Sequence, residues 1–146
     1  MANQDSTQLL RTFYDAVNSH DIDRVISCFN SDGEFKTIAF DSTARGANEL
    51  KTMIQGWYQA FPDMKIETSN INGTGDWAVA ELTLKGTQRG PFQTPQGEIA
   101  PTNQHVQAPA CDVVKFKNGK ISSFHCYLES GTLMAQLGWK SSRVAA

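Results

Sequence analysis

The second half of the chain alternates apolar and polar residues over long runs, and this pattern restricts the fold more than any other feature. Runs at 77–87, about 104–117 and 120–129 each repeat with the period of two that marks a half-buried strand. "KNGK" between the last two runs predicts a tight hairpin turn. A further run at 64–71 precedes a "NGTGD" turn. Four consecutive strands joined by hairpins predict one strongly twisted antiparallel sheet.

Amphipathic helices come mainly before these strands. Apolar residues recur at helical spacing near 9–17, 22–29 and 50–61, and Pro62 ends the third of these helices. A strand is predicted at 34–40, and a short last helix at 130–137 that ends at Gly138. Helices gathered ahead of a meander predict an α+β fold. A curved sheet covered by helices should enclose a conical pocket, which is a natural site for a small molecule.

Two segments have no strand or helix pattern. Residues 41–46 form a polar connection, and "RGPFQTPQGEIAPTN" at 89–103 predicts a long loop, a type that often serves as a functional lid. Within the strand at 104–117, we expect a bulge or bend at Pro109, because proline cannot donate to a sheet ladder.

Length and charge narrow the class of protein. The 146 residues suit a single domain, 1–146, and the net charge of −2 without a basic run argues against a nucleic-acid partner. No apolar run approaches the ~20 residues of a membrane span, and the start resembles no signal peptide, so we expect a cytoplasmic protein with no membrane partner. The three cysteines and three histidines lack metal-ligand spacing, so we expect free thiols and no metal.

The last hairpin places polar groups on one face if its ladder is regular. A two-residue turn at 118–119 would set His125 opposite Asp112 and Glu129 opposite Ala108. Alternate strand residues share a face, so Glu129, Tyr127, His125 and Asp112 would gather together. Cys126 and Cys111 would lie opposite each other on the reverse face. We expect the polar face to line the pocket and the other face to pack against a second subunit.

This placement predicts acid–base chemistry. A carboxyl group in an apolar pocket has a raised pKa, which suits Glu129 to moving a proton near neutral pH. The alternative is that Glu129 only caps the helix that follows it. Asp112 could fix the tautomer of His125 and help to polarise a substrate carbonyl, or the two could be an ordinary satisfied pair.

Four further residues are candidates for contact with the substrate. Tyr127 shares the polar face, and His105 follows the long loop and could reach the pocket mouth. Trp57 and Tyr14 lie on helix faces that could line the pocket, although such apolar stripes more often belong to the core.

Several segments, in order, resemble one known family. "FYDAVNSHDIDRVISCFNSDGEF" is similar to the opening of NTF2-like proteins, and "ARGANELKTMIQGWYQAFPDMKIE" and "LTLKGTQRGPF" resemble its SnoaL-like branch, the polyketide cyclase relatives. "APTNQHV" is similar to that branch's proline-threonine-glycine segment, with Asn103 in place of glycine. "FKNGKI" and "YLESGTLMAQLG" match its terminal hairpin and final helix.

The resemblance implies a cone-shaped α+β barrel, usually a homodimer, with an enclosed pocket and no cofactor. It also implies that the position of Glu129, seven residues before Gln136, is that of an acid–base aspartate in the cyclases. The leading hypothesis is a cofactor-independent enzyme that closes a ring by an aldol step, or isomerises, a hydrophobic oxygenated molecule. Epoxide opening and ligand binding without reaction are the alternatives. Converging acid and base groups in a deep pocket would favour catalysis, whereas Glu129 facing solvent would favour binding alone.

Overall fold

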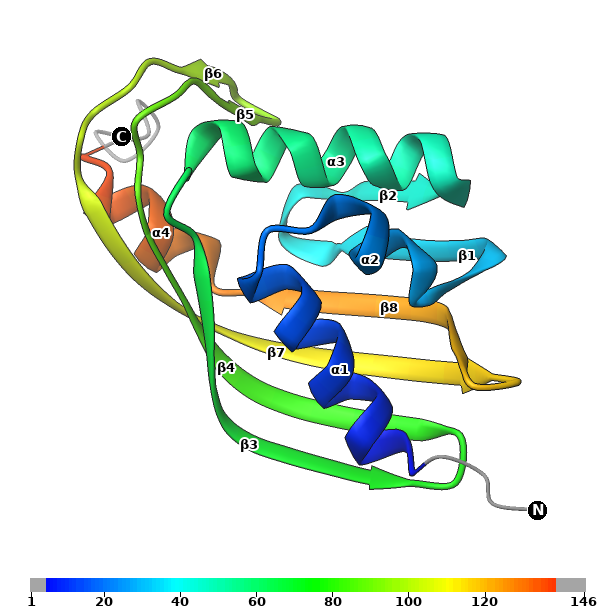
Figure 1. Ribbon diagram of the computed structural model, residues 1–146. Coiled ribbons are helices and arrows are strands. Elements are labelled where there is room, and N and C mark those ends of the chain that lie inside the picture. The colour runs from blue at the N-terminus through cyan, green and yellow to red at the C-terminus, as the bar shows by residue number, and fades with distance from the viewer. Residues whose placement is uncertain (1–4, 139–146) are drawn as a thin grey trace.

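One strongly curved sheet, covered on one face by helices, forms the body of the protein (Figure 1). The computed structural model describes residues 5–138. The order of elements along them is α1 (Ser6–Asn18), α2 (Ile22–Ser27), β1 (Phe29–Thr37), η1 (Ile38–Phe40), β2 (Ser42–Arg45), α3 (Gly46–Ala60), β3 (Lys65–Thr74), β4 (Trp77–Thr87), β5 (Phe92–Thr94), β6 (Gly97–Ile99), β7 (His105–Lys117), β8 (Lys120–Leu128) and α4 (Ser130–Gln136). The predicted α+β class is confirmed.

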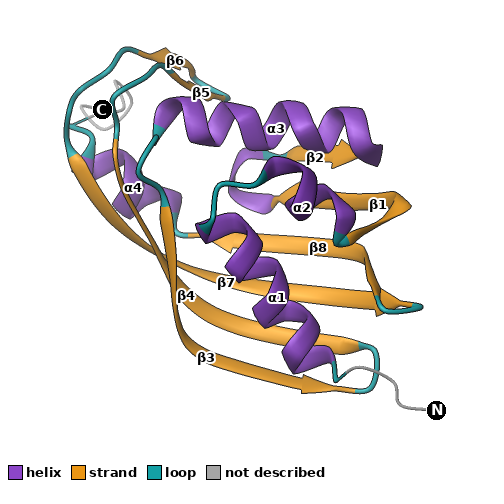
Figure 2. Ribbon diagram, in the orientation of Figure 1, coloured by secondary structure: helices purple, strands orange, loops and turns teal. Residues whose placement is uncertain are grey.

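The main sheet is mixed and open. Its strand order over the described residues is β2-β1-β8-β7-β4-β3, in which β1 and β8 run parallel and the other neighbours antiparallel. Helices α1, α2 and α3 lie over the same face of this sheet (Figure 2). Side chains from that face and from the helices make up one buried apolar cluster. The expected curved sheet with a helical cover is therefore confirmed, although the sheet does not close into a barrel.

Local signals explain where the helices begin and end. The Asp5 side chain accepts a hydrogen bond from the Thr7 backbone N–H, and Asp21 does the same for Arg24, so each caps the start of its helix. Helix α3 stops at Ala60, just before Phe61 and Pro62, because proline cannot continue the helical hydrogen bonds. Gly138, with φ of +79°, follows α4 as a left-handed residue.

Three short strands lie where the sequence predicted irregular chain. The connection 41–46 contains β2, an edge strand with one buried residue, Ala44, and so with no apolar alternation to reveal it. The loop 89–103 contains β5 and β6, which form a separate two-stranded hairpin beside the end of α3 (Figure 2). Short strands of three or four residues carry too few positions for a period of two to be recognised.

The bulge in the last hairpin is not at Pro109, where it was expected. Lys117 pairs with Lys120 as predicted, but the register shifts between Lys115 and Phe116 and leaves Ser122 as an extra residue in β8. Beyond this bulge Asp112 pairs with Cys126, and Val113 with His125. A shift of one residue exchanges the two faces of a strand, so every pairing predicted further along the ladder is wrong by one position.

Pro109 lies in a regular part of β7, paired with Thr83 of β4. The Pro109 carbonyl accepts a hydrogen bond from the Glu129 N–H, one residue beyond the last β7–β8 pair, Ala110 and Leu128. The carbonyl and the nitrogen of one strand residue point to the same side, so the Pro109 nitrogen also faces Glu129. The missing N–H would have bonded to the Glu129 carbonyl, which instead accepts from Leu133 in the first turn of α4. The start of α4 therefore removes the need for a donor at Pro109.

Gln88 anchors the segment that carries the β5–β6 hairpin. Its side chain is fully buried, and its amide donates to the carbonyls of Gly90, Ile99 and Ala100. Its carbonyl accepts from the backbone N–H and the hydroxyl of Thr102. One side chain thus satisfies polar groups at both ends of the hairpin, and this bonding fixes a segment that was predicted to be a lid-like loop.

Replacing Gln88 with alanine should lower the free energy of unfolding by on the order of 3 kcal/mol, because several buried polar groups would lose their partners together. Urea unfolding measures this loss, and hydrogen exchange should show the amides of residues 89–103 exchanging faster. Exposed Gln93 on the same hairpin is the control, and Gln93→Ala should change stability by less than about 0.5 kcal/mol. Equal stability of Gln88→Ala and the natural chain would contradict this role.

Candidate functional site

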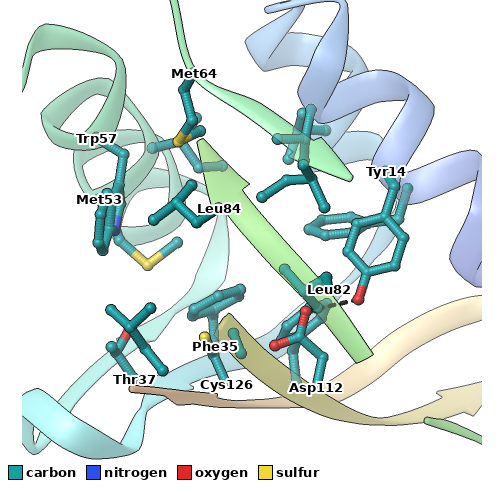
Figure 3. Close-up of a pocket in the computed structure, with 18 of the residues that line it drawn as sticks. Tyr14, Phe35, Thr37, Met53, Trp57, Met64, Leu82, Leu84, Asp112 and Cys126 are labelled. Carbon is teal, nitrogen blue, oxygen red and sulfur yellow. Dashed lines mark hydrogen bonds between the residues drawn. The ribbon is translucent and has the colours of Figure 1, made fainter. Parts of the chain in front are cut away.

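A small apolar cavity lies between the helices and the curved sheet (Figure 3). Its volume is about 100 Å³. Its walls are almost wholly hydrocarbon and aromatic, with side chains from α1, α2, α3 and the inner face of the strands: Phe13, Tyr14, Val17, Val25, Phe29, Phe35, Thr37, Met53, Ile54, Trp57, Tyr58, Met64, Ile66, Leu82, Leu84, Ala110, Asp112, Phe124, Cys126 and Leu128. The expected pocket is therefore present.

Asp112 is the one carboxylate among the residues that line this cavity. It is 3% exposed, and it stands on β7 between Cys126 of β8 and Ala80 of β4. The hydroxyl of Tyr14, from α1, donates a hydrogen bond of 2.6 Å to its Oδ2 (Figure 3). Its other oxygen, Oδ1, is buried and has no hydrogen-bond partner among the described residues. A buried acceptor left open in this way is available to a ligand.

Burial dominates the electrostatics of this pair. Desolvation raises the pKa of Asp112 to about 7, and the Tyr14 hydroxyl and the Cys126 thiol only partly oppose it. Desolvation and the neighbouring carboxylate raise the pKa of Tyr14 far above its usual range, so Tyr14 stays protonated as the donor. Burial and the nearby Asp112 likewise raise the pKa of Cys126. Near neutral pH, the carboxyl group can therefore either accept or give a proton, as acid–base chemistry requires.

The bulge decides which face of β8 meets the cavity. Phe124, Cys126 and Leu128 line it, whereas His125 and Tyr127 lie on the outer face. The expectation that the polar face lines the pocket is therefore wrong for these two residues. His125 Nε2 lies 3.2 Å from the hydroxyl of Ser123, and Tyr127 is 46% exposed.

Glu129 does not face the cavity either. Its side chain is exposed, and its Oε1 accepts a hydrogen bond from the hydroxyl of Thr132. It occupies the residue just before α4, which agrees with the alternative interpretation that it belongs to the start of that helix. Its expected position in a water-poor pocket is wrong, because the bulge turns Leu128 toward the cavity and Glu129, the next residue, falls on the opposite side.

The remaining candidates divide between the cavity and the surface. Tyr14 and Trp57 line the cavity, as their helical faces suggested. His105 is exposed at the start of β7, where its Nδ1 lies 3.1 Å from the hydroxyl of Thr87, and it is not among the cavity residues. No group of three or more potential metal ligands gathers within residues 5–138.

Sequence reasoning named Asp112 and Tyr14 but missed that they form a pair, and it placed Cys126 on the wrong face. A signal was present in β8, where Ile121 and Phe124 are both buried but are three residues apart. Strict alternation cannot bury both, so the two serines between them mark the extra residue. The apolar face of β8 was also the better choice for the cavity, since interiors select apolar side chains.

Solved structures share this fold. A protein of Jannaschia sp. CCS1 assigned to the SnoaL-like polyketide cyclases superposes with a TM-score of 0.81, at 15% identity over 97% of this chain and 98% of its own. A Catenulispora acidiphila protein with a ketosteroid isomerase-like fold gives 0.77, at 14% identity over 91% and 94%. An LEH-like epoxide hydrolase of Mycobacterium tuberculosis gives 0.70, at 18% identity over 92% of each chain. At these identities the likeness concerns the fold.

No curated protein sequence matches the chain. The sequence profile described as SnoaL-like polyketide cyclase, in contrast, matches residues 8–137, which include every secondary-structure element from α2 to α4 and most of α1. The chain belongs to the SnoaL-like polyketide cyclase family, with the NTF2-like fold of its ketosteroid isomerase-like structural neighbours.

Proposed function

We propose that this protein is a cofactor-independent acid–base enzyme for a hydrophobic, oxygen-bearing small molecule, and that Asp112 carries the proton. The observation that supports this most directly is the open Oδ1 of Asp112, buried in the wall of an apolar cavity, with the other oxygen held by Tyr14. Family membership favours ring closure of a polyketide-like substrate.

The proposed reaction is an intramolecular aldol addition. Ionised Asp112 removes a proton from the carbon next to a substrate carbonyl, and the resulting enolate carbon attacks a second carbonyl of the same molecule. A carbon–carbon bond forms, and the new alkoxide takes back the proton from Asp112, so the product is an isomer of the substrate. A pKa near 7 suits both halves of this cycle, because neither the loss nor the gain of the proton is costly.

Tyr14 positions the carboxyl group in this scheme. Its hydrogen bond fixes Oδ2 and so directs Oδ1 at the substrate, and it also lowers the pKa of Asp112, which burial would otherwise raise further. The apolar walls exclude water, which keeps the enolate from being quenched before it attacks.

Epoxide opening is the second chemical candidate, favoured by the likeness of the fold to an LEH-like epoxide hydrolase. Asp112 would then remove a proton from a water molecule or a substrate hydroxyl. The cavity is lined by a single carboxylate and mostly by hydrocarbon, which offers little to hold a water molecule. Aldol chemistry therefore remains the first proposal.

Binding without reaction is favoured by one observation, the exposed position of Glu129, because the cavity then holds one carboxylate rather than a converging acid and base. Substitution of Asp112 separates the two hypotheses. An enzyme would lose its reaction and keep its ligand, whereas a binding protein would have no reaction to lose.

Asp112→Asn should lower proton exchange at carbon by about 10²- to 10⁴-fold, because the amide cannot accept the proton. Acetophenone in D₂O is a suitable probe, since deuterium uptake at its methyl carbon, followed by NMR, reports removal of a proton next to a carbonyl. Glu129→Gln is the matched control and should leave the rate unchanged, because Glu129 is exposed outside the cavity. If Asp112→Asn catalyses deuterium uptake as fast as the natural chain, the assignment of Asp112 as the acid–base residue is wrong.

The same buried carboxyl predicts a pH dependence of stability. Its pKa is about 7 in the folded chain and about 4 when unfolded, so the folded chain holds the proton more tightly. The contribution of protonated Asp112 to the free energy of unfolding is thus fully present below about pH 4 and is lost as the pH rises to about 7. Relative to Asp112→Asn, the natural chain should lose roughly 4 kcal/mol of unfolding free energy over that window. Urea titrations at pH 4, 5.5 and 7 measure it, and parallel curves for the two chains would contradict the raised pKa.

A homodimer through the outer sheet face is part of the proposal. Trp77, Val79 and Tyr127 on that face are 46%, 41% and 46% exposed, and Val113 pairs with Val79 between them. Clustered large apolar side chains on a surface mark interfaces, and a self-complementary patch suits two-fold pairing.

We also propose a cytoplasmic location, supported by the three free cysteines, because unpaired thiols are typical of reducing compartments.

Val79→Glu should convert the dimer to a monomer in light scattering, because the interface would bury the new charge in each subunit. Ile38→Glu is the control: Ile38 is 42% exposed but lies in η1, away from the patch, so the dimer should persist. A natural chain that is monomeric at micromolar concentration would refute this interface.

A further inference from the structure

Strand β7 extends beyond the end of β8, and α4 lies beside it where the next part of β8 would lie. The last β7–β8 pair is Ala110 with Leu128, so residues 105–109 of β7 have no partner in β8. Figure 1 shows α4 at the end of the sheet where β8 stops, and α4 packs against β7. A strand without a neighbour on one side leaves backbone N–H and C=O groups open on that edge.

Two contacts attach α4 to that edge. At the start of α4, the Glu129 N–H donates to the Pro109 carbonyl over 3.0 Å. At its end, the Gln107 N–H donates to Gln136 Oε1 over 2.7 Å, and Gln136 Nε2 donates to the Gln107 carbonyl over 3.0 Å. A primary amide carries a donor and an acceptor side by side, as a residue of a neighbouring strand does. The Gln136 side chain therefore takes the place of a strand residue, and we call its two bonds to Gln107 the α4 latch.

The helix held by this latch lies close to the carboxyl group in the cavity. Leu128, which directly precedes Glu129, lines the cavity together with its β7 partner Ala110. Along β7, Ala110 is the next residue after Asp112 on the inner face, roughly 7 Å away. Apolar side chains of α4 and of the residue that ends it complete the buried cluster around the cavity: Leu133, Met134 and Leu137. Moving α4 would therefore open the cluster one strand pair from Asp112.

Helix α4 has little stability of its own. It spans seven residues, whereas α1 and α3 span 13 and 15, and an isolated helix of that length does not persist in water. No side chain caps its first turn by a hydrogen bond, and it contains Gly131, which is unfavourable within a helix. Its conformation thus depends on the buried apolar side chains and on the latch.

The latch itself can open at small cost. Gln107 and Gln136 are both exposed, so water replaces their hydrogen bonds when the helix moves away. The attachment at Glu129 differs, because the chain runs directly from β8 through Glu129 into α4. The far end of α4 is therefore the end that can leave the sheet, while the start stays in place as a hinge.

We propose that α4 is a lid that controls entry of small molecules to the cavity. It turns about Glu129, and the bonds between Gln136 and Gln107 hold it closed. When the latch opens, α4 moves away from β7 and a molecule enters past Leu128 to reach Asp112, while the sheet and the longer helices keep their positions. The proposal concerns access to the cavity and holds whether or not Asp112 catalyses a reaction.

Hydrogen exchange and thiol labelling measure the latch and the access separately. The Leu133 and Leu137 amides donate to carbonyls within the α4 segment, so their exchange reports its opening. Cys126 lines the cavity opposite Asp112, so its labelling reports access, and Cys28 at the end of α2 is the internal reference. Methyl methanethiosulfonate is a small neutral reagent, and mass spectrometry gives the labelling rate of each thiol.

Gln136→Met keeps the length of the side chain and removes both latch bonds. The α4 amides should exchange about tenfold faster, because two exposed hydrogen bonds together contribute about that factor. Labelling of Cys126 should accelerate severalfold relative to Cys28. Gln136→Asn retains the amide but is one methylene too short to reach both backbone groups, so it should change both rates in the same direction if the methionine variant fails to fold. Gln55→Met is the matched control, because Gln55 is exposed on α3 and does not line the cavity, and both rates should stay unchanged.

Three results would overturn the proposal. Unchanged exchange of the α4 amides would mean that Gln136 does not hold the helix. Faster exchange with unchanged labelling of Cys126 would mean that α4 opens without admitting molecules to the cavity. Equal acceleration at Cys126 and Cys28 would mean that the substitution loosens the whole fold. Faster exchange in α4 together with selective acceleration at Cys126 supports the lid, and it does so without any measurement of turnover.

Discussion

The hydrogen bond from Tyr14 to Asp112 is the interaction on which the site depends. It joins α1 to the middle of β7, 98 residues apart in sequence, inside an apolar layer where a polar atom without a partner is costly. Half of the carboxyl group is satisfied in this way and half is left open. The folded chain is therefore more stable when Asp112 is protonated or when a ligand bonds to its open oxygen. Stability, pH and binding are in this way connected at a single residue.

A one-residue bulge gives that carboxyl group its surroundings. Without the extra Ser122, Asp112 would pair with His125 rather than with Cys126. With it, the cavity face of β8 consists of Phe124, Cys126 and Leu128, while His125 and Tyr127 turn to the outer face, which also carries Trp77 and Val79 two strands away on β4. The same bulge thus makes the inner face apolar around Asp112 and supplies the outer face with the aromatic and aliphatic surface that we propose for dimer contact.

Periodicity along the chain determined the helices, the long strands, the tight turn at 118–119 and the α+β class, because these depend on residues close together in sequence. The family resemblance added the expectation of a covered, curved sheet with a pocket. Sequence also supplied Asp112, Tyr14 and Trp57 as candidates, but only as separate residues. The tertiary structure decided that Tyr14 meets Asp112, that Cys126 faces the cavity, and that Glu129 faces solvent. These outcomes turn on strand register and on contacts between distant segments, where one inserted residue reverses which side chains are buried.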